Sequence, residues 1–189
     1  QHSVARAIEL GWAGVRVELR HLGITATEVH RFQRLLSAVV FPHPALRPGQ
    51  APASSTQRGL AGLWSQGISG DLPIVLLRLD HAEFTEICRD LLLAHEFWRL
   101  NGFTCDLVII NEEPTGYLQG TQDQVRELIQ RAQVDQRGGV FLRRADQMNE
   151  EARELLSCAA RVVVHASQGS LARQLRRAAA ARELPEPAW

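Results

Sequence analysis

The sequence lacks several features that mark common functional classes. It contains no lysine at all, and its 21 basic residues, all arginine, are balanced by 21 acidic residues. A nucleic-acid-binding domain usually carries a net basic surface, so this balance argues against nucleic acid as a partner. The Walker phosphate-binding loop needs a lysine and is therefore excluded.

Long apolar segments are also missing. Apolar runs such as Ile74–Leu77 and Leu91–Ala94 are short, whereas a helix that spans a bilayer needs roughly 20 apolar residues. Residues 1–6 are not followed by the apolar stretch of a signal peptide. We therefore expect a soluble chain without membrane contact, and its start at Gln1 suggests processing or a piece of a longer protein.

Motifs for metals, cofactors and nucleophiles are absent as well. The three cysteines, Cys88, Cys105 and Cys158, form no C-x-x-C pair, which excludes a zinc ribbon and a thioredoxin motif and favours a reducing compartment. The seven histidines show no metal-ligand spacing, and no strand is followed by a G-x-G-x-x-G or G-x-S-x-G motif. We expect no metal, no cofactor and no catalytic residue.

The first 71 residues divide into two parts. Residues 1–41 are compatible with helices, the second of which opens on a capping box from Thr25 to Glu28 and stops before Pro42. We interpret residues 1–41 as a helical arm. Residues 42–71 are rich in Pro, Gly, Ser and Ala and have little periodicity, which predicts a connector loop. A loop this long is uncommon inside a compact domain and is often functional.

Residues 72–182 alternate between short apolar runs and amphipathic helices, and residues 183–189 form a predicted flexible tail. The predicted strands are Pro73–Leu79, Cys105–Ile110, Gly139–Leu142 and Val162–His165. The predicted helices are Ala82–Leu100, Tyr117–Ala132, Glu150–Ala159 and Ser170–Ala181. Such alternation predicts parallel pairing, and continuous apolar strands indicate helices on both faces. The expected fold class is α/β, a small three-layer α/β/α sandwich with a four-stranded parallel sheet.

Polar residues cluster after the predicted strands. Ligands of open parallel sheets bind outside the carboxyl ends of the strands. The candidates at this rim are Asp80, His81, Asn111, Glu112, Glu113, Tyr117, Arg144 and His165. They could supply a general acid and base. We favour the alternative that residues here and nearby, including Asp80, Asp146, Asn149, Ser167 and Ser170, cap helices or face solvent.

A second candidate site precedes the first strand. The turn Gly67–Asp71 (GISGD) follows Trp64, and its two glycines permit positive φ. We predict that Trp64, Gly67, Ser69, Gly70 and Asp71 form a contact to a ligand or a neighbouring domain. The equally weighted alternative places Trp64 in the core, filling a gap between the arm and the sheet, with Asp71 bonded to amides of its own turn.

Several long segments resemble cyclic β-1,2-glucan synthases, in the same order, from the arm to about Gln174. They are Leu63–Leu76, Asp106–Glu112 with Gly116–Gln119, Arg31–Arg34 with Phe41–Arg47, His95–Arg99, and Ala160–Val164 with Gly169–Ala172. The resemblance implies a very large bacterial inner-membrane protein that joins a UDP-glucose-dependent glucosyltransferase to a cellobiose-phosphorylase-like region. That region carries β-sandwich modules and a helical barrel. The chain resembles the segment between the sandwich modules, upstream of the barrel, and no catalytic residue of the family has a counterpart here.

Three functions remain open on this reading. The favoured one is a non-catalytic spacer that positions the β-sandwich and helical-barrel domains, on the cytoplasmic side of the inner membrane. The alternatives are a module that binds β-1,2-glucan and, less favoured, a free-standing α/β enzyme that uses the strand-end carboxylates. An aromatic content of only 6% favours the spacer over the binding module.

Overall fold

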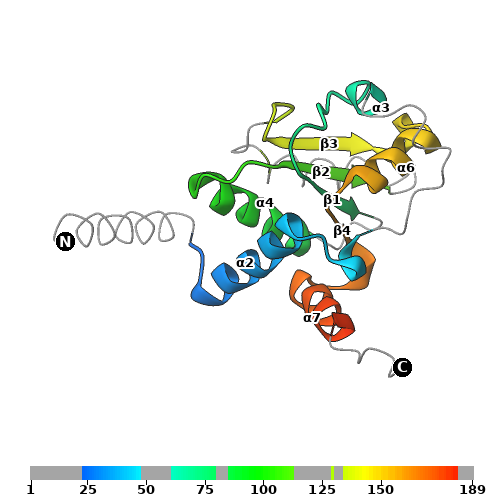
Figure 1. Ribbon diagram of the computed structural model, residues 1–189. Helices are drawn as coiled ribbons and strands as arrows, with labels where there is room; N and C mark the ends of the chain where they lie inside the picture. The colour runs from blue at the N-terminus through cyan, green and yellow to red at the C-terminus, as the bar shows by residue number, and fades with distance from the viewer. Residues whose placement is uncertain (1–22, 48–60, 80–84, 113–128, 130–133, 183–189) are drawn as a thin grey trace.

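The structure is a computed structural model of the 189-residue chain. It describes residues 23–47, 61–79, 85–112, 129 and 134–182 (Figure 1). Within these residues, no helix is long and apolar enough to cross a bilayer.

A four-stranded parallel sheet forms the centre of the domain. Its strands are β1 (Ile74–Leu79), β2 (Asp106–Asn111), β3 (Val140–Arg144) and β4 (Val162–His165), in the spatial order β3-β2-β1-β4. The predicted four-stranded parallel sheet is confirmed, and β4 has the predicted bounds. The predicted third strand ended at Leu142, but β3 continues through two arginines because Arg143 and Arg144 pair with Ile110 and Asn111.

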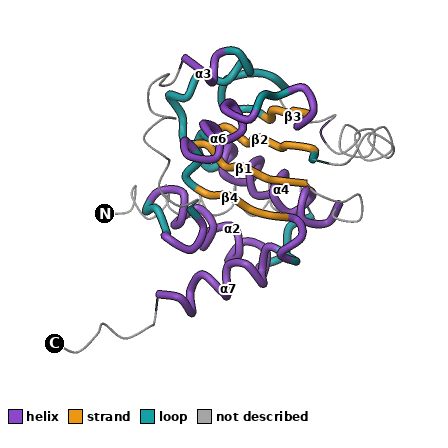
Figure 2. The backbone as a smooth tube through the Cα atoms, turned by 90° about the vertical axis from the view of Figure 1, so that its right-hand side faces the viewer, coloured by secondary structure: helices purple, strands orange, loops and turns teal. Residues whose placement is uncertain are grey.

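Helices cover both faces of the sheet (Figures 1 and 2). On one face, α2 (Ala26–Val40), α4 (Thr85–Leu100) and α7 (Leu171–Arg182) bury apolar residues against Val75, Leu77 and Leu79. On the other face, α3 (Ala61–Trp64) and α6 (Glu150–Ala159) pack against Ile74 and Leu76. Alternate residues of β1 therefore enter different cores, as the pleat of a strand requires. This arrangement confirms the predicted α/β sandwich.

The helices after the strands agree closely with the predictions. Helix α6 has the predicted bounds, and α7 begins one residue later than expected. The helix expected at residues 117–132 lies outside the described residues except for Ile129, which is helical and buried on the α4 face of the sheet.

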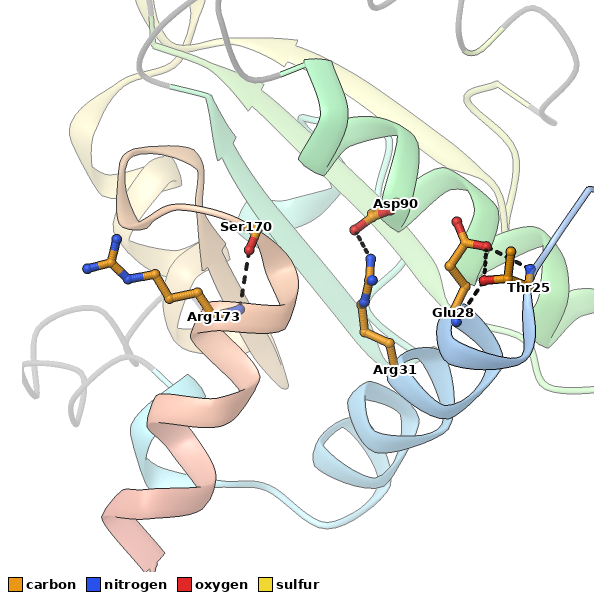
Figure 3. Close-up of polar contacts among 6 residues, drawn as sticks. All are labelled: Thr25, Glu28, Arg31, Asp90, Ser170 and Arg173. Atoms are coloured by element: carbon orange, nitrogen blue, oxygen red, sulfur yellow. Dashed lines mark hydrogen bonds and ion pairs between the residues drawn. The ribbon is translucent and has the colours of Figure 1, made fainter.

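Helix α2 is an integral part of the domain. The predicted capping box is present, since the Thr25 hydroxyl accepts a hydrogen bond from the Glu28 amide and Glu28 Oε2 accepts one from the Thr25 amide (Figure 3). Arg31 Nη1 donates to Asp90 Oδ2 on α4 at 2.6 Å (Figure 3). Phe32 is fully buried in the core that α2 shares with the sheet. The rest of the predicted arm, residues 1–22, lies outside the described residues.

The region predicted as a connector contains two short helices. The 3-10 helix η1 (Pro44–Leu46) packs against β4 and α7, and α3 covers residues 61–64. The interpretation of this region as loop was wrong for these seven positions. A helix of three or four residues is too short to show an apolar period, and its position is set by tertiary packing of Leu46 and Leu63, which are both buried.

Candidate functional site

Trp64 lies on the surface of the domain. Its neighbour Leu63 is fully buried in the α6-side core, whereas 65% of Trp64 is exposed. The indole Nε1 donates a hydrogen bond to the Ser69 carbonyl at 3.2 Å. The alternative that Trp64 fills a gap in the core is therefore wrong, because α3 directs Leu63 inward and leaves its neighbour outside.

The loop after Trp64 is anchored to the sheet by Arg143. Arg143 Nε donates to the Gln66 carbonyl at 3.0 Å, and Arg143 Nη1 donates to Asp135 Oδ1 at 2.7 Å. The same guanidinium lies 5.4 Å from the Phe141 ring centroid, within cation–π range. The loop is therefore attached to β3 and is also secured by the buried side chain of Ile68. Arg143 is not among the site residues that the sequence predicts.

The two glycines of the loop have the backbone geometry that the sequence predicts. Gly67 and Gly70 have φ values of 73° and 76°, in the left-handed region that favours glycine. A Cβ atom at Gly67 would also lie 3.4 Å from Arg143 Nη2. The turn and its anchoring arginine are thus packed in contact with each other.

Asp71 closes the loop with side-chain partners. The Ser69 hydroxyl donates to Asp71 Oδ1, and Arg137 Nε donates to Asp71 Oδ2 at 2.8 Å. These hydrogen bonds, with that from Ser69 first, hold the pKa of Asp71 below its usual value. The alternative had Asp71 bonded to amides of its own turn, whereas its largest hydrogen-bond contributions come from the Ser69 and Arg137 side chains and a backbone amide contributes least. Asp71 and Arg137 are largely exposed, so their pairing orients the loop and contributes little stability.

Two buried polar side chains, Asp106 at the start of β2 and His95 on α4, contact backbone groups near the amino end of β2. Asp106 is fully buried, and its Oδ1 accepts a hydrogen bond from the Gly138 amide at 2.7 Å. Burial raises the pKa of this carboxyl group. His95 is also buried, its Nε2 lies 3.0 Å from the Cys105 carbonyl, and burial lowers its pKa. Both shifts favour the uncharged forms, and both contacts fix the start of β2.

Gly138 has a structural requirement for glycine. Its φ is 75°, and a Cβ atom there would lie 2.3 Å from Thr104 Cγ2. Only glycine allows the turn before β3 to approach β2 this closely and still donate its amide to Asp106. The side chain of Asp106 thus links β2 to the segment that carries Arg137, the partner of Asp71.

The strand-end rim holds structural ion pairs. Arg78 on β1 donates to Glu112 after β2, with Nε and Oε1 2.7 Å apart. Arg144 Nε donates to Asp146 Oδ1 at 3.0 Å, and this pairing lowers the pKa of Asp146. Asn111, which is the last residue of β2, is buried. Arg78 was not among the predicted rim residues.

The strand order keeps the remaining rim candidates apart. Arg144 ends β3 and His165 ends β4, and these strands form opposite edges of the described sheet. Three strand spacings separate them, or about 14 Å. Asp80, His81, Glu113 and Tyr117 lie outside the described residues. Among the residues that are described, no three His, Cys, Asp or Glu side chains group in a way that could hold a metal ion.

Two of the predicted helix caps are confirmed. Asn149 Oδ1 accepts from the Ala152 amide at 2.8 Å at the start of α6. Ser170 Oγ accepts from the Arg173 amide at 3.4 Å before α7 (Figure 3). Asp146, also considered as a cap, is instead paired with Arg144. Polar residues after β3 and β4 therefore stabilise helix starts, as expected of caps.

The fold defines the class of protein as an open, parallel α/β domain, and its most distinctive surface feature is a fixed loop that presents Trp64. No protein-family model matches the chain. The chain is 35% identical over 175 residues to the cyclic beta-(1,2)-glucan synthase NdvB of Rhizobium meliloti (strain 1021). The match covers 88% of this chain and 6% of that protein. The chain is thus similar to the NdvB-like cyclic β-1,2-glucan synthase family and spans only a small segment of the length of that relative.

Proposed function

We propose that this domain is a non-catalytic spacer of a cyclic β-1,2-glucan synthase, and that the loop from Trp64 to Asp71 is its contact to a neighbouring domain of the synthase. The observation that carries the proposal is that the Trp64 side chain is exposed and is also held in place. The side chain is 65% exposed, yet its indole nitrogen is hydrogen-bonded to Ser69 and its loop is bonded to Arg143.

A fixed, exposed tryptophan suits a protein–protein contact. Tryptophan is enriched among the residues that dominate binding energies at interfaces. Its large apolar surface brings most benefit when little conformational entropy is lost on binding. Here the backbone of the loop is already held by Arg143 before any partner arrives. The expected partners are the neighbouring β-sandwich and helical-barrel domains that the family resemblance implies.

The non-catalytic part of the proposal is supported by what the polar rim residues do. Arg78 and Glu112 pair with each other, and Arg144 pairs with Asp146. Asn149 and Ser170 cap helices. These groups have structural partners, and the strand order keeps Arg144 and His165 at opposite edges of the sheet. On the same proposal, the parent synthase is embedded in the inner membrane, and this domain lies on its cytoplasmic side.

A second candidate function is binding of β-1,2-glucan. The exposed indole of Trp64 favours it, because pockets and surfaces for small ligands commonly use aromatic faces with a few fixed polar groups beside them. Ser69 and Asp71 supply such groups next to the indole. In this case the free-standing chain would bind glucan without any other domain.

One pair of measurements separates the two candidates. The 189-residue chain is titrated by NMR with linear and cyclic β-1,2-glucans, and the Trp64→Ala substitution is made in the synthase that contains this segment. The spacer proposal predicts no saturable shifts at residues 63–71 and a several-fold loss of cyclic glucan production by the variant. Phe41→Ala, which removes another exposed aromatic residue, is the matched control and should retain production.

Saturable shifts at the loop that disappear in Trp64→Ala would favour the glucan-binding function instead. Unchanged glucan production by the Trp64→Ala synthase, together with no shifts, would contradict both candidates.

A further inference from the structure

A pocket of about 260 Å³ lies on the opposite edge of the sheet from Arg143. It is lined by residues of η1, β4, the 3-10 helix η5 (Ala166–Gln168) and α7. Leu46, Val163 and Ala178 are buried residues that contribute its apolar lining. Segments more than a hundred positions apart in the sequence therefore build it, since η1 packs against both β4 and α7.

The charge of this pocket has one sign. Arg47 and Arg177 line it together with His165 and Gln168, and no acidic residue is among the lining residues. The arginines within the described strands, Arg78, Arg143 and Arg144, are each paired with a carboxylate. Neither Arg47 nor Arg177 makes a hydrogen bond or an ion pair with a residue in the described part of the chain.

The wall of the pocket is held by a buried glutamine. Gln174 Nε2 donates to the carbonyls of His165 and Gly169, at 2.7 and 2.8 Å, and Oε1 accepts from the His165 amide at 3.3 Å. Gln174 is also buried. These bonds fix the carboxyl end of β4 against α7, so the pocket is formed before any ligand binds.

The pocket lies beside β4, which is an edge strand of the described sheet. Open α/β sheets bind ligands outside the carboxyl ends of their strands. Two lining residues belong to that end of β4, since His165 is its last residue and Gln168 lies in η5 directly after it.

We propose that this pocket binds a small phosphorylated ligand, with its phosphate group between Arg47 and Arg177. Guanidinium groups bind phosphate oxygens through paired, charge-assisted hydrogen bonds. The apolar lining then receives the carbon skeleton, and Gln168 offers hydrogen bonds to hydroxyl groups. A volume of about 260 Å³ is slightly below the range typical of drug-sized ligands, which favours a ligand of metabolite size. The site is separate from the Trp64 loop and does not depend on the spacer function.

Titration of the 189-residue chain followed by NMR tests this proposal. The probes are ribose 5-phosphate, inorganic phosphate and ribose, each up to roughly 10 mM, which detects a dissociation constant near 1 mM. We expect saturable shifts at Val163–Gln168 with ribose 5-phosphate, weaker binding of inorganic phosphate, and none with ribose. Arg177→Gln and Arg47→Gln should each weaken binding of ribose 5-phosphate about tenfold, the loss of one charge-assisted contact.

The matched control is Arg176→Gln. Arg176 is an exposed neighbour on the same helix and is not among the residues that line the pocket. The proposal requires that this variant bind as the unmodified chain does. Equal losses in Arg176→Gln and Arg177→Gln would show binding to overall positive charge, and an absence of shifts with both phosphate probes would equally overturn the proposal. Inorganic phosphate binding alone, without any gain from ribose 5-phosphate, would overturn the assignment of the apolar lining to a carbon skeleton.

Discussion

Replacing Trp98 by alanine is expected to destabilise the chain by about 3–5 kcal/mol, the range for loss of a large buried aromatic side chain. Trp98 is 1% exposed, and its Nε1 donates to the Phe32 carbonyl on α2 at 3.1 Å. Its ring also meets Phe103 edge to face, with the centroids 6.2 Å apart. The side chain thus joins α2 to α4, and its removal leaves a cavity and takes away the second donor of the Phe32 carbonyl, which keeps its hydrogen bond within α2. Urea unfolding measures the change in free energy.

Trp98→Phe is the control that separates packing from hydrogen bonding. It retains an aromatic ring but removes the indole donor, which costs about 0.5–1.5 kcal/mol, the net value of one hydrogen bond, because the Phe32 carbonyl keeps its bond within α2. A loss below about 1 kcal/mol for Trp98→Ala would contradict the conclusion that α2 is an integral part of the core.

Leu63→Ala is expected to cost about 2–5 kcal/mol, the range for leucine in a core, whereas Trp64→Ala should change stability by no more than about 0.5 kcal/mol. The two residues are neighbours on α3, so they share the same local backbone. Leu63 is fully buried between α6 and the sheet, whereas 65% of the surface of Trp64 is exposed. Urea unfolding of both variants tests whether the larger side chain, Trp64, contributes less to stability than Leu63 does.

The unfolding free energy of Trp64→Ala decides whether Trp64 is a surface residue or a core residue. If Trp64→Ala were as destabilising as Leu63→Ala, the indole would be a structural residue and the loop would lose its role as a contact. Trp64→Tyr retains an exposed aromatic ring and should match the unmodified chain in stability.

The sheet could be predicted because its strands carry a strong signal. Residues 74–77, 107–110 and 162–164 are continuous apolar runs, and the structure buries them on both faces of the sheet. Caps at Thr25, Asn149 and Ser170 could be predicted for a similar reason, since the cap depends only on residues three positions away.

The contacts of the candidate sites could not be predicted, because they depend on strand order and tertiary packing. The sequence does not tell that β4 lies beside β1 and not beside β3, so Arg144 and His165 were expected on one shared rim. Nothing local marks Arg143 as the anchor of a loop 77 positions earlier in the chain. Arg47 and Arg177 come together only because η1 packs against α7.

Amide hydrogen exchange at residues 65–71 tests the proposed contact most directly. It is compared between the isolated 189-residue chain and the same segment within the synthase, because amides covered by a partner exchange more slowly. Slowing by at least about tenfold, equivalent to about 1.4 kcal/mol of protection, is predicted at this loop, with unchanged exchange at the exposed turn formed by Asn101 and Gly102. Equal exchange rates at residues 65–71 in both proteins would contradict the assignment of the Trp64 loop as the contact of a spacer domain.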